Sequence, residues 1–193
     1  MTDSFQNFES DKLVSLLQNG SLGVLPTDTL YGLVCAAKNK AAVERLYELK
    51  SREKKPGTII AAGIDQLVEL GLKRRYLKAV EGYWPDAVSI VIPTIDPSTA
   101  YLRQELLGLA VRVVADKKLI ELLLHTGPLL TTSANLPGEK PADTIEEARE
   151  YFGDKVDFYV DGGSLKDRKP STLIRIVDDA VEILREGAVT IRG

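Results

Sequence analysis

Short strand-like runs alternate with short helices along the whole of this 193-residue chain, and this alternation limits the possible folds more than any other feature. No internal repeat, low-complexity stretch or linker rich in proline, glycine and serine interrupts it. A chain of this length can bury roughly 70% of its unfolded surface in one core. We therefore expect one α/β domain over residues 1–193.

Hydrophobic periodicity predicts the order of the elements. Several connections are too short for a helical crossover, so we expect a twisted, partly antiparallel sheet with helices packed on it. The expected helices are 11–18, 66–70, 73–83, one capped by Asn39, one capped by Asp116 that ends near His125, and one from Thr144 to Phe152. The expected strands are 22–25, 58–62, 88–92, 109–114, 128–131, 156–160, 172–177 and 181–184.

The composition limits the classes of partner and compartment. The formal net charge of −3 argues against electrostatic binding of nucleic acid or an anionic membrane by the surface as a whole. A local basic pocket is compatible with this charge. The single cysteine, Cys35, excludes an internal disulfide, indicates a reducing compartment and is expected to be a small buried residue. No run approaches ~18 apolar residues and the N-terminus has no basic start, so we expect a cytoplasmic protein without a membrane partner.

Four cations fall within six positions of this acidic chain: Lys50, Arg52, Lys54 and Lys55. Lys50 is the next position on the apolar stripe of the preceding helix, so its side chain is predicted to point toward the sheet. With Arg52 and Lys55 it could bind a phosphate or a carboxylate. The same charges could instead stabilise the helix C-terminus by ~0.3 to 1 kcal/mol or pair with Glu48 and Glu53. Spacing alone does not decide between anion binding and helix stabilisation.

Hydroxyl groups gather at two places. The segment 27–29 has the composition of a turn that closes a strand. The strip Thr131, Thr132, Ser133 and Asn135 could cap a helix or turn, but it lies at a strand end, where open α/β sheets bind ligands. Between them, the strand at 109–114 places Arg112 on the face opposite its apolar side chains.

Common catalytic signatures are absent from the sequence: it has no Walker A loop, no dinucleotide-binding glycine motif, no nucleophile elbow and no His-Glu-x-x-His. The only histidine, His125, lies at an expected helix C-terminus, where dipole compensation or exposure explains it. Without a thiol or histidine cluster, a metal ion would be a hard cation held by oxygens. The simplest expectation is Mg²⁺ accompanying a phosphate substrate.

Five ordered segments resemble the YrdC-like threonylcarbamoyl-AMP synthases: Pro26 to Leu33, Lys50-x-Arg52 with Lys55-Pro56, Ala110 to Val113, Thr131 to Asn135, and Pro170 to Thr172. The resemblance spans residues 20 to about 187 and is closest to the short, single-domain bacterial type. It implies a twisted α/β sheet around a positively charged cavity. It also implies that L-threonine, bicarbonate and ATP yield threonylcarbamoyl-AMP and pyrophosphate, the first step of the N6-threonylcarbamoyladenosine modification of tRNA.

The resemblance implies roles for individual residues. Lys50 and Arg52 would be catalytic and would hold the ATP phosphates and the carbamate, with Lys55 adding charge. Thr29 and Tyr31 would line the threonine pocket, and Arg112, Thr131 and Ser171 would contact threonine. Ser133, Asn135 and Arg185 would serve the nucleotide, with Mg²⁺ bridging phosphates of ATP largely through water. Asp28 receives no role.

Two segments depart from the family pattern. The chain has Asp86-Ala87-Val88-Ser89 where Gly-Pro-x-Thr is usual, and Leu173-Ile174-Arg175 replaces an expected acidic residue. These departures keep a second hypothesis open, a YrdC-like paralogue that binds RNA or a nucleotide without making the adenylate. For the synthase, the resemblance suggests a partner complex that transfers the threonylcarbamoyl group to tRNA.

Overall fold

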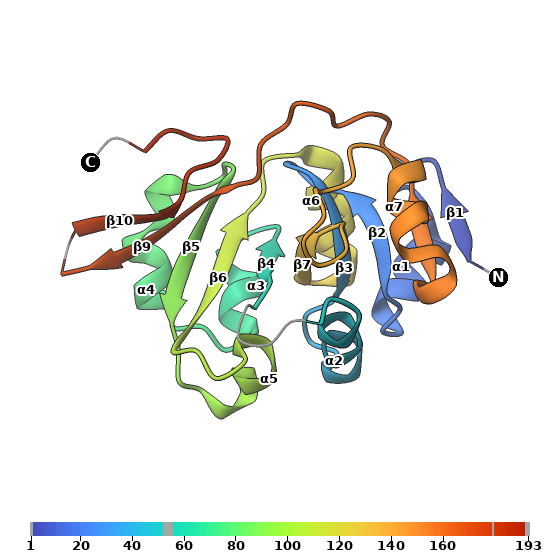
Figure 1. Ribbon diagram of the computed structural model, residues 1–193. Coiled ribbons are helices and arrows are strands. Elements are labelled where there is room, and N and C mark those ends of the chain that lie inside the picture. Colours follow the sequence, from blue (N-terminus) through green and yellow to red (C-terminus); the bar gives the residue numbers. More distant parts are fainter. Residues whose placement is uncertain (1, 52–55, 179, 192–193) are drawn as a thin grey trace.

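The computed structural model describes residues 2–51, 56–178 and 180–191, and its centre is a ten-stranded twisted sheet (Figure 1). The strands lie in the order β1-β8-β2-β3-β7-β4-β6-β5-β9-β10. Their bounds are β1 Asp3–Phe5, β2 Gly23–Pro26, β3 Tyr31–Ala36, β4 Thr58–Ala61, β5 Val88–Pro93, β6 Gly108–Val113, β7 Leu129–Ser133, β8 Phe158–Val160, β9 Thr172–Val177 and β10 Ala180–Arg185.

The sheet is mixed, as the short connections predict. β8 pairs in parallel with both β1 and β2, β4 with β6, and β5 with β9. The other neighbours pair antiparallel, including β3 with β7 and β7 with β4 at the centre of the sheet. The long connection over residues 161–171 runs along the upper edge of the sheet in Figure 1 and joins β8 to the distant strand β9.

Helices cover both faces of the sheet. Their bounds are α1 Asp11–Gln18, α2 Lys40–Leu49, α3 Ile64–Glu69, α4 Arg74–Ala79, α5 Ala100–Arg103, α6 Lys117–Thr126 and α7 Ile145–Phe152. Buried side chains of α2, α3, α4, α5 and α7 share one hydrophobic cluster, to which β6 contributes Leu109, Val111 and Val113. Those of α1 and α6 share a second cluster. Among the described residues, no helix is long and apolar enough to cross a membrane.

The side chains of Asn39, Asp116 and Thr144 cap their helices as predicted, whereas the side chain of Ser10, before α1, makes no capping hydrogen bond. The side chains of Asn39 and Asp116 accept hydrogen bonds from Ala42 N and Leu119 N, at the starts of α2 and α6. At α7, Thr144 Oγ1 accepts from Glu147 N, while Glu147 Oε2 accepts from Asp143 N, one residue earlier than a standard capping box. These caps satisfy backbone donors that the helices cannot pair internally.

Two sequence predictions need correction. The helix expected over 73–83 divides into α4 and a 3₁₀ turn over Glu81–Tyr83, because the backbone leaves the helical region at Val80, with φ −118° and ψ 4°. Strand β1, helix α5 and the central strand β3 were not predicted from the sequence. Every residue of β3 is buried, so its side chains show no alternation of polar and apolar residues.

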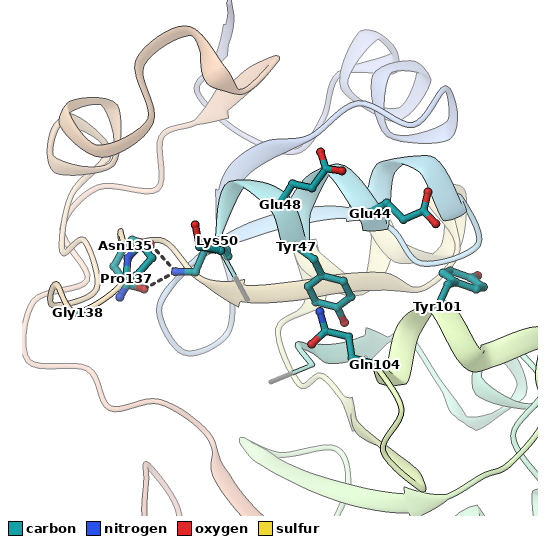
Figure 2. A pocket seen from close by; sticks show the side chains of 10 residues that line it. Glu44, Tyr47, Glu48, Lys50, Tyr101, Gln104, Asn135, Pro137 and Gly138 are labelled. Carbon is teal, nitrogen blue, oxygen red and sulfur yellow. Dashed lines mark hydrogen bonds between the residues drawn. The ribbon is translucent and has the colours of Figure 1, made fainter. Parts of the chain in front are cut away.

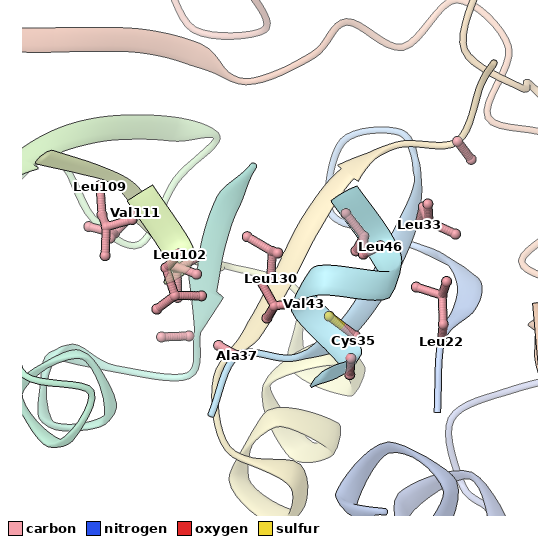
Figure 3. Packing of buried hydrophobic residues seen from close by; sticks show 14 of the residues in the cluster. Leu22, Leu33, Cys35, Ala37, Val43, Leu46, Leu102, Leu109, Val111 and Leu130 are labelled. Atoms are coloured by element: carbon pink, nitrogen blue, oxygen red, sulfur yellow. The ribbon is translucent and has the colours of Figure 1, made fainter. Parts of the chain in front are cut away.

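Cys35 is a buried core residue, as expected. It is fully buried on β3 and packs in the cluster that includes Leu22, Leu33 and α2 residues Val43 and Leu46 (Figure 3). Burial raises the pKa of its thiol from an ordinary value of 9.0 to about 12. The folded state therefore holds this proton more tightly than the unfolded state. The resulting stabilisation is complete below pH 9 and is lost as the pH rises toward 12.

This shift predicts an alkaline loss of stability that depends on Cys35. Between pH 9 and pH 10, the thiol should lower the free energy of unfolding by about 1 kcal/mol, because the unfolded state releases the proton first. Burial raises the pKa values of Tyr31 and Tyr159 as well, but these phenols lower the free energy of unfolding mainly above pH 10. Urea unfolding of Cys35→Ala at both pH values should show a smaller loss than the unaltered chain. Equal losses would contradict the prediction.

Candidate functional site

The predicted site residues that the structure describes line two cavities. The smaller has a volume of about 140 Å³, and we call it the arginine pocket because Arg112 and Arg185 line it. Of the nine predicted site residues that the structure describes, seven line this pocket: Thr29, Tyr31, Arg112, Thr131, Ser133, Ser171 and Arg185. They come from segments far apart in the sequence, so the fold brings the separate motifs together.

Arg112 forms a buried ion pair with Asp28. Its Nη2 lies 2.6 Å from Asp28 Oδ1 and its Nε lies 3.1 Å from Oδ2, which is a bidentate contact. The side chains of Arg112 and Asp28 are only 3% and 8% exposed, so water contributes little to their solvation. The predicted face is confirmed, since Arg112 points away from the cluster that contains Val111 and Val113. Asp28, which had no role from sequence, is the counter-ion of Arg112.

A row of hydrogen bonds continues from Arg112 to Arg185. Arg112 Nη1 donates to Ser89 Oγ at 3.1 Å, and Ser89 Oγ lies 2.8 Å from Ser171 Oγ. Arg185 Nη2 donates to both Ser171 O, at 2.9 Å, and Ser171 Oγ, at 3.2 Å. The row connects β6, β5 and β10 behind the pocket. Ser89, one of the departures from the family pattern, is therefore a buried member of the site.

The segment 27–29 is a turn, as its composition predicts. Thr27 Oγ1 donates to Leu30 O at 2.6 Å and accepts from the backbone N–H groups of Thr29 and Leu30. The Oγ1 atoms of Thr27 and Thr29 lie 3.1 Å apart, so Thr29 is held at the pocket wall. The turn also presents Asp28 to Arg112. The turn thus satisfies local backbone groups and positions two side chains at the pocket.

Tyr31 lines the pocket while its hydroxyl holds the connection over 161–171. Tyr31 Oη accepts from Gly162 N and donates to Gly163 O, each at 2.8 Å. Burial raises the pKa of this phenol above its ordinary value of 10.0. The contact fixes one end of the connection, whose other end supplies Ser171 to the pocket.

The hydroxyl strip is a strand end rather than a cap, because β7 extends to Ser133. A Cβ atom on Gly32 would lie 2.4 Å from Thr131 Oγ1, so only glycine at this position leaves room for that hydroxyl. Among the described residues, Thr132 Oγ1 is buried without a hydrogen-bond partner. Thr131 and Ser133 thus line the pocket from one strand.

The larger cavity has a volume of about 830 Å³, and we call it the lysine cleft after Lys50 (Figure 2). Lys50 is 3% exposed and donates from Nζ to Ser133 O at 3.0 Å, to Asn135 Oδ1 at 2.9 Å and to Asn135 O. The predicted inward direction of Lys50 is confirmed. Ser133 lines the arginine pocket, so Lys50, a residue of the cleft, contacts a residue of that pocket.

The charge of the two cavities is only partly described. Glu44 and Glu48 line the lysine cleft beside Lys50, whereas two arginines line the pocket. The predicted residues Arg52 and Lys55 lie outside the described residues. The predicted positive cavity therefore stays a prediction. Within residues 2–51, 56–178 and 180–191, no group of three or more His, Cys, Asp or Glu side chains could hold a metal ion.

A family model described as telomere recombination, for Sua5, YciO and YrdC proteins, matches residues 15–187. The chain belongs to the Sua5/YciO/YrdC family. This match covers most of the chain and agrees with the expected span of 20 to about 187. Membership confirms the resemblance that the five ordered sequence segments indicate.

Curated family members are similar over most of the chain. The threonylcarbamoyl-AMP synthase of Vibrio campbellii is 33% identical, over 94% of this chain and 100% of its own length. The threonylcarbamoyl-AMP synthase of Marinobacter nauticus is 35% identical, over 82% of this chain and 86% of its own length. A putative threonylcarbamoyl-AMP synthase of Methanocaldococcus jannaschii is 31% identical, over 90% of this chain and 83% of its own length.

Solved structures share the fold. An H234A/Y235A variant of P. abyssi Sua5 superposes with a TM-score of 0.86 at 26% identity, over 97% of this chain and 60% of that one. P. abyssi Sua5 in complex with L-threonine gives 0.83 at 25% identity, over 97% and 57%. This chain thus spans somewhat more than half of Sua5. E. coli YciO, with a TM-score of 0.81 at 24% identity, shows the same fold over 96% of its length.

Proposed function

We propose that this chain is a threonylcarbamoyl-AMP synthase, which converts L-threonine, bicarbonate and ATP into threonylcarbamoyl-AMP and pyrophosphate. The observation that carries the proposal is a pair of cavities: the smaller contains the buried Arg112, and Lys50 of the larger donates to Ser133 of the smaller. Relatives that are named as this synthase match the chain over most of its length. They favour the synthase over the paralogue that only binds RNA or a nucleotide.

The sizes of the cavities suit the two substrates. The lysine cleft, at about 830 Å³, falls within the range of ~300 to 1,000 Å³ typical of pockets for larger ligands. The arginine pocket, at about 140 Å³, is too small for a nucleotide and suits an amino acid. A related Sua5 is described in complex with L-threonine. We assign threonine to the pocket and most of ATP to the cleft.

The reaction needs no side-chain nucleophile. The amine of threonine attacks the carbon of bicarbonate, and loss of water gives a carbamate. A carbamate oxygen then attacks the α-phosphorus of ATP, and the bond to pyrophosphate breaks. The protein has to hold the two reactants in line and stabilise the charge that develops. The absence of the common nucleophile motifs is consistent with this chemistry.

The assigned roles follow the positions of the residues. Arg112, Thr131 and Ser171 bind the carboxylate and hydroxyl of threonine, with Thr29 and Tyr31 as walls of the pocket. Lys50 neutralises phosphate and carbamate oxygens, and the family resemblance assigns Arg52 and Lys55 to the same task. Ser133 and Asn135 position the nucleotide. Arg185 lies with Ser171 in the arginine pocket, so we assign it to the phosphate nearest threonine.

Mg²⁺ is proposed as part of the substrate, bound to ATP phosphates and water. The product would pass to a complex that modifies tRNA, so a cytoplasmic location is part of the same proposal. RNA binding by this chain is the remaining alternative, and it predicts an affinity that falls steeply as salt rises.

A coupled pyrophosphate assay with mass spectrometry of the adenylate tests the proposal. Pyrophosphate should appear only when ATP, L-threonine and bicarbonate are all present, together with threonylcarbamoyl-AMP. Serine and valine in place of threonine serve as controls. Pyrophosphate release without threonine would contradict the synthase, and salt-sensitive RNA binding without any adenylate would favour the alternative.

A further inference from the structure

The buried arginine has donors that the protein leaves for a ligand. A guanidinium carries five N–H donors. In the described structure, Arg112 uses three of them. The Nε–H and one N–H of Nη2 donate to Asp28, and one N–H of Nη1 donates to Ser89. Two donors remain, one on each terminal nitrogen. A carboxylate can accept from both terminal nitrogens at once.

Asp28 decides which edge of Arg112 is occupied. Both of its carboxylate oxygens accept from Arg112, and the pair is almost closed to water. An unpaired N–H on the buried edge would be costly, so the guanidinium would turn to find another partner if Asp28 were removed. Ser89, which is fully buried, holds Nη1 from the opposite side. The guanidinium plane is therefore held by contacts on two sides.

We propose that Asp28 is a positioning residue: it holds the Nε edge of Arg112 so that the two remaining donors face the carboxylate of the amino-acid substrate. Asp28 offsets the charge of Arg112, so orientation of these donors, rather than net charge alone, selects the carboxylate. The inference rests on the proposed function, because it takes threonine as the ligand of the arginine pocket. It adds a residue for which the sequence motifs implied no role.

Calorimetric binding of two ligands separates positioning from a general structural role. L-threonine carries the carboxylate, whereas L-threoninamide keeps the amine and the hydroxyl but lacks that charge. Asp28→Asn should weaken threonine binding by about 10- to 100-fold, because misplaced donors lose a bidentate contact. Threoninamide binding should change by less than about threefold. Asp65→Asn, which breaks the exposed ion pair with Arg74, is the matched control and should change neither affinity.

A double variant tests whether Asp28 acts through Arg112. If it does, Arg112→Gln/Asp28→Asn should bind threonine as weakly as Arg112→Gln alone, and thermal unfolding should show that it is folded. A further loss in the double variant, equal losses for both ligands in Asp28→Asn, or no loss at all would each overturn the assignment of Asp28. Absence of threonine binding to the unaltered chain would instead overturn the proposed function, and this assignment with it.

Discussion

Replacement of Lys50 by methionine should lower the rate of pyrophosphate release by about 10²- to 10³-fold, the effect of removing one preorganised charge from an active site. Lys50 is 3% exposed and donates to acceptors on Ser133 and Asn135, so its ammonium is fixed in position. Methionine keeps the length of the side chain but neither the charge nor the donors. Initial rates at saturating ATP, threonine and bicarbonate measure the effect.

Two variants control for damage to the helix. Lys40→Met lies at the start of α2, where Lys40 is exposed and pairs with Glu44, and it should leave the rate within about twofold. Lys50→Arg keeps the charge and should retain more activity than Lys50→Met. A Lys50→Met enzyme with the unaltered rate would remove Lys50 from the proposed mechanism.

Replacement of Arg112 by glutamine should lower the free energy of unfolding by about 3 to 5 kcal/mol, because it leaves the carboxylate of Asp28 buried without its partner. The two side chains are only 3% and 8% exposed, so solvent cannot replace the lost contact. Chemical denaturation at pH 7 measures the loss. Adding Asp28→Asn should recover part of the stability, because the double variant carries no unpaired buried charge.

The exposed pair Arg74 and Asp65 provides the comparison. Its side chains are 53% and 81% exposed, and Arg74→Gln should cost at most about 1 kcal/mol although the contact distance, 2.7 Å, is similar. If both variants lost the same stability, burial would not be the reason for the large effect at Arg112.

Much of the site was predictable because periodicity reports the direction of single side chains. The helical stripe of α2 placed Lys50 toward the sheet, and the alternation in β6 placed Arg112 away from the apolar cluster. Both directions are confirmed by contacts, since Lys50 donates to Ser133 O on β7 and Arg112 pairs with Asp28. The motifs around residues 29, 131 and 171 also meet in one pocket. Local pattern and ordered motifs were sufficient for these residues.

Other parts of the site could not be predicted from patterns in the sequence. β3 was missed because a strand buried on both faces reads as a continuous apolar run. Asp28 looked like a turn residue, and Ser89 like a departure from the family pattern. Their contacts with Arg112 join residues 84 and 23 positions apart in the chain. Local periodicity carries no information about such contacts.

By itself the sequence determined the α/β class, most helix starts, the family and the inward direction of Lys50 and Arg112, because these follow from local propensity, spacing and motif order. Only the tertiary structure decided that Asp28 is the partner of Arg112 and that Ser89 and Ser171 link Arg112 to Arg185. It also decided that Lys50 of the large cleft donates to Ser133 of the small pocket. The physical reason is that ion pairing and cavity shape depend on strands that meet only when the sheet is assembled.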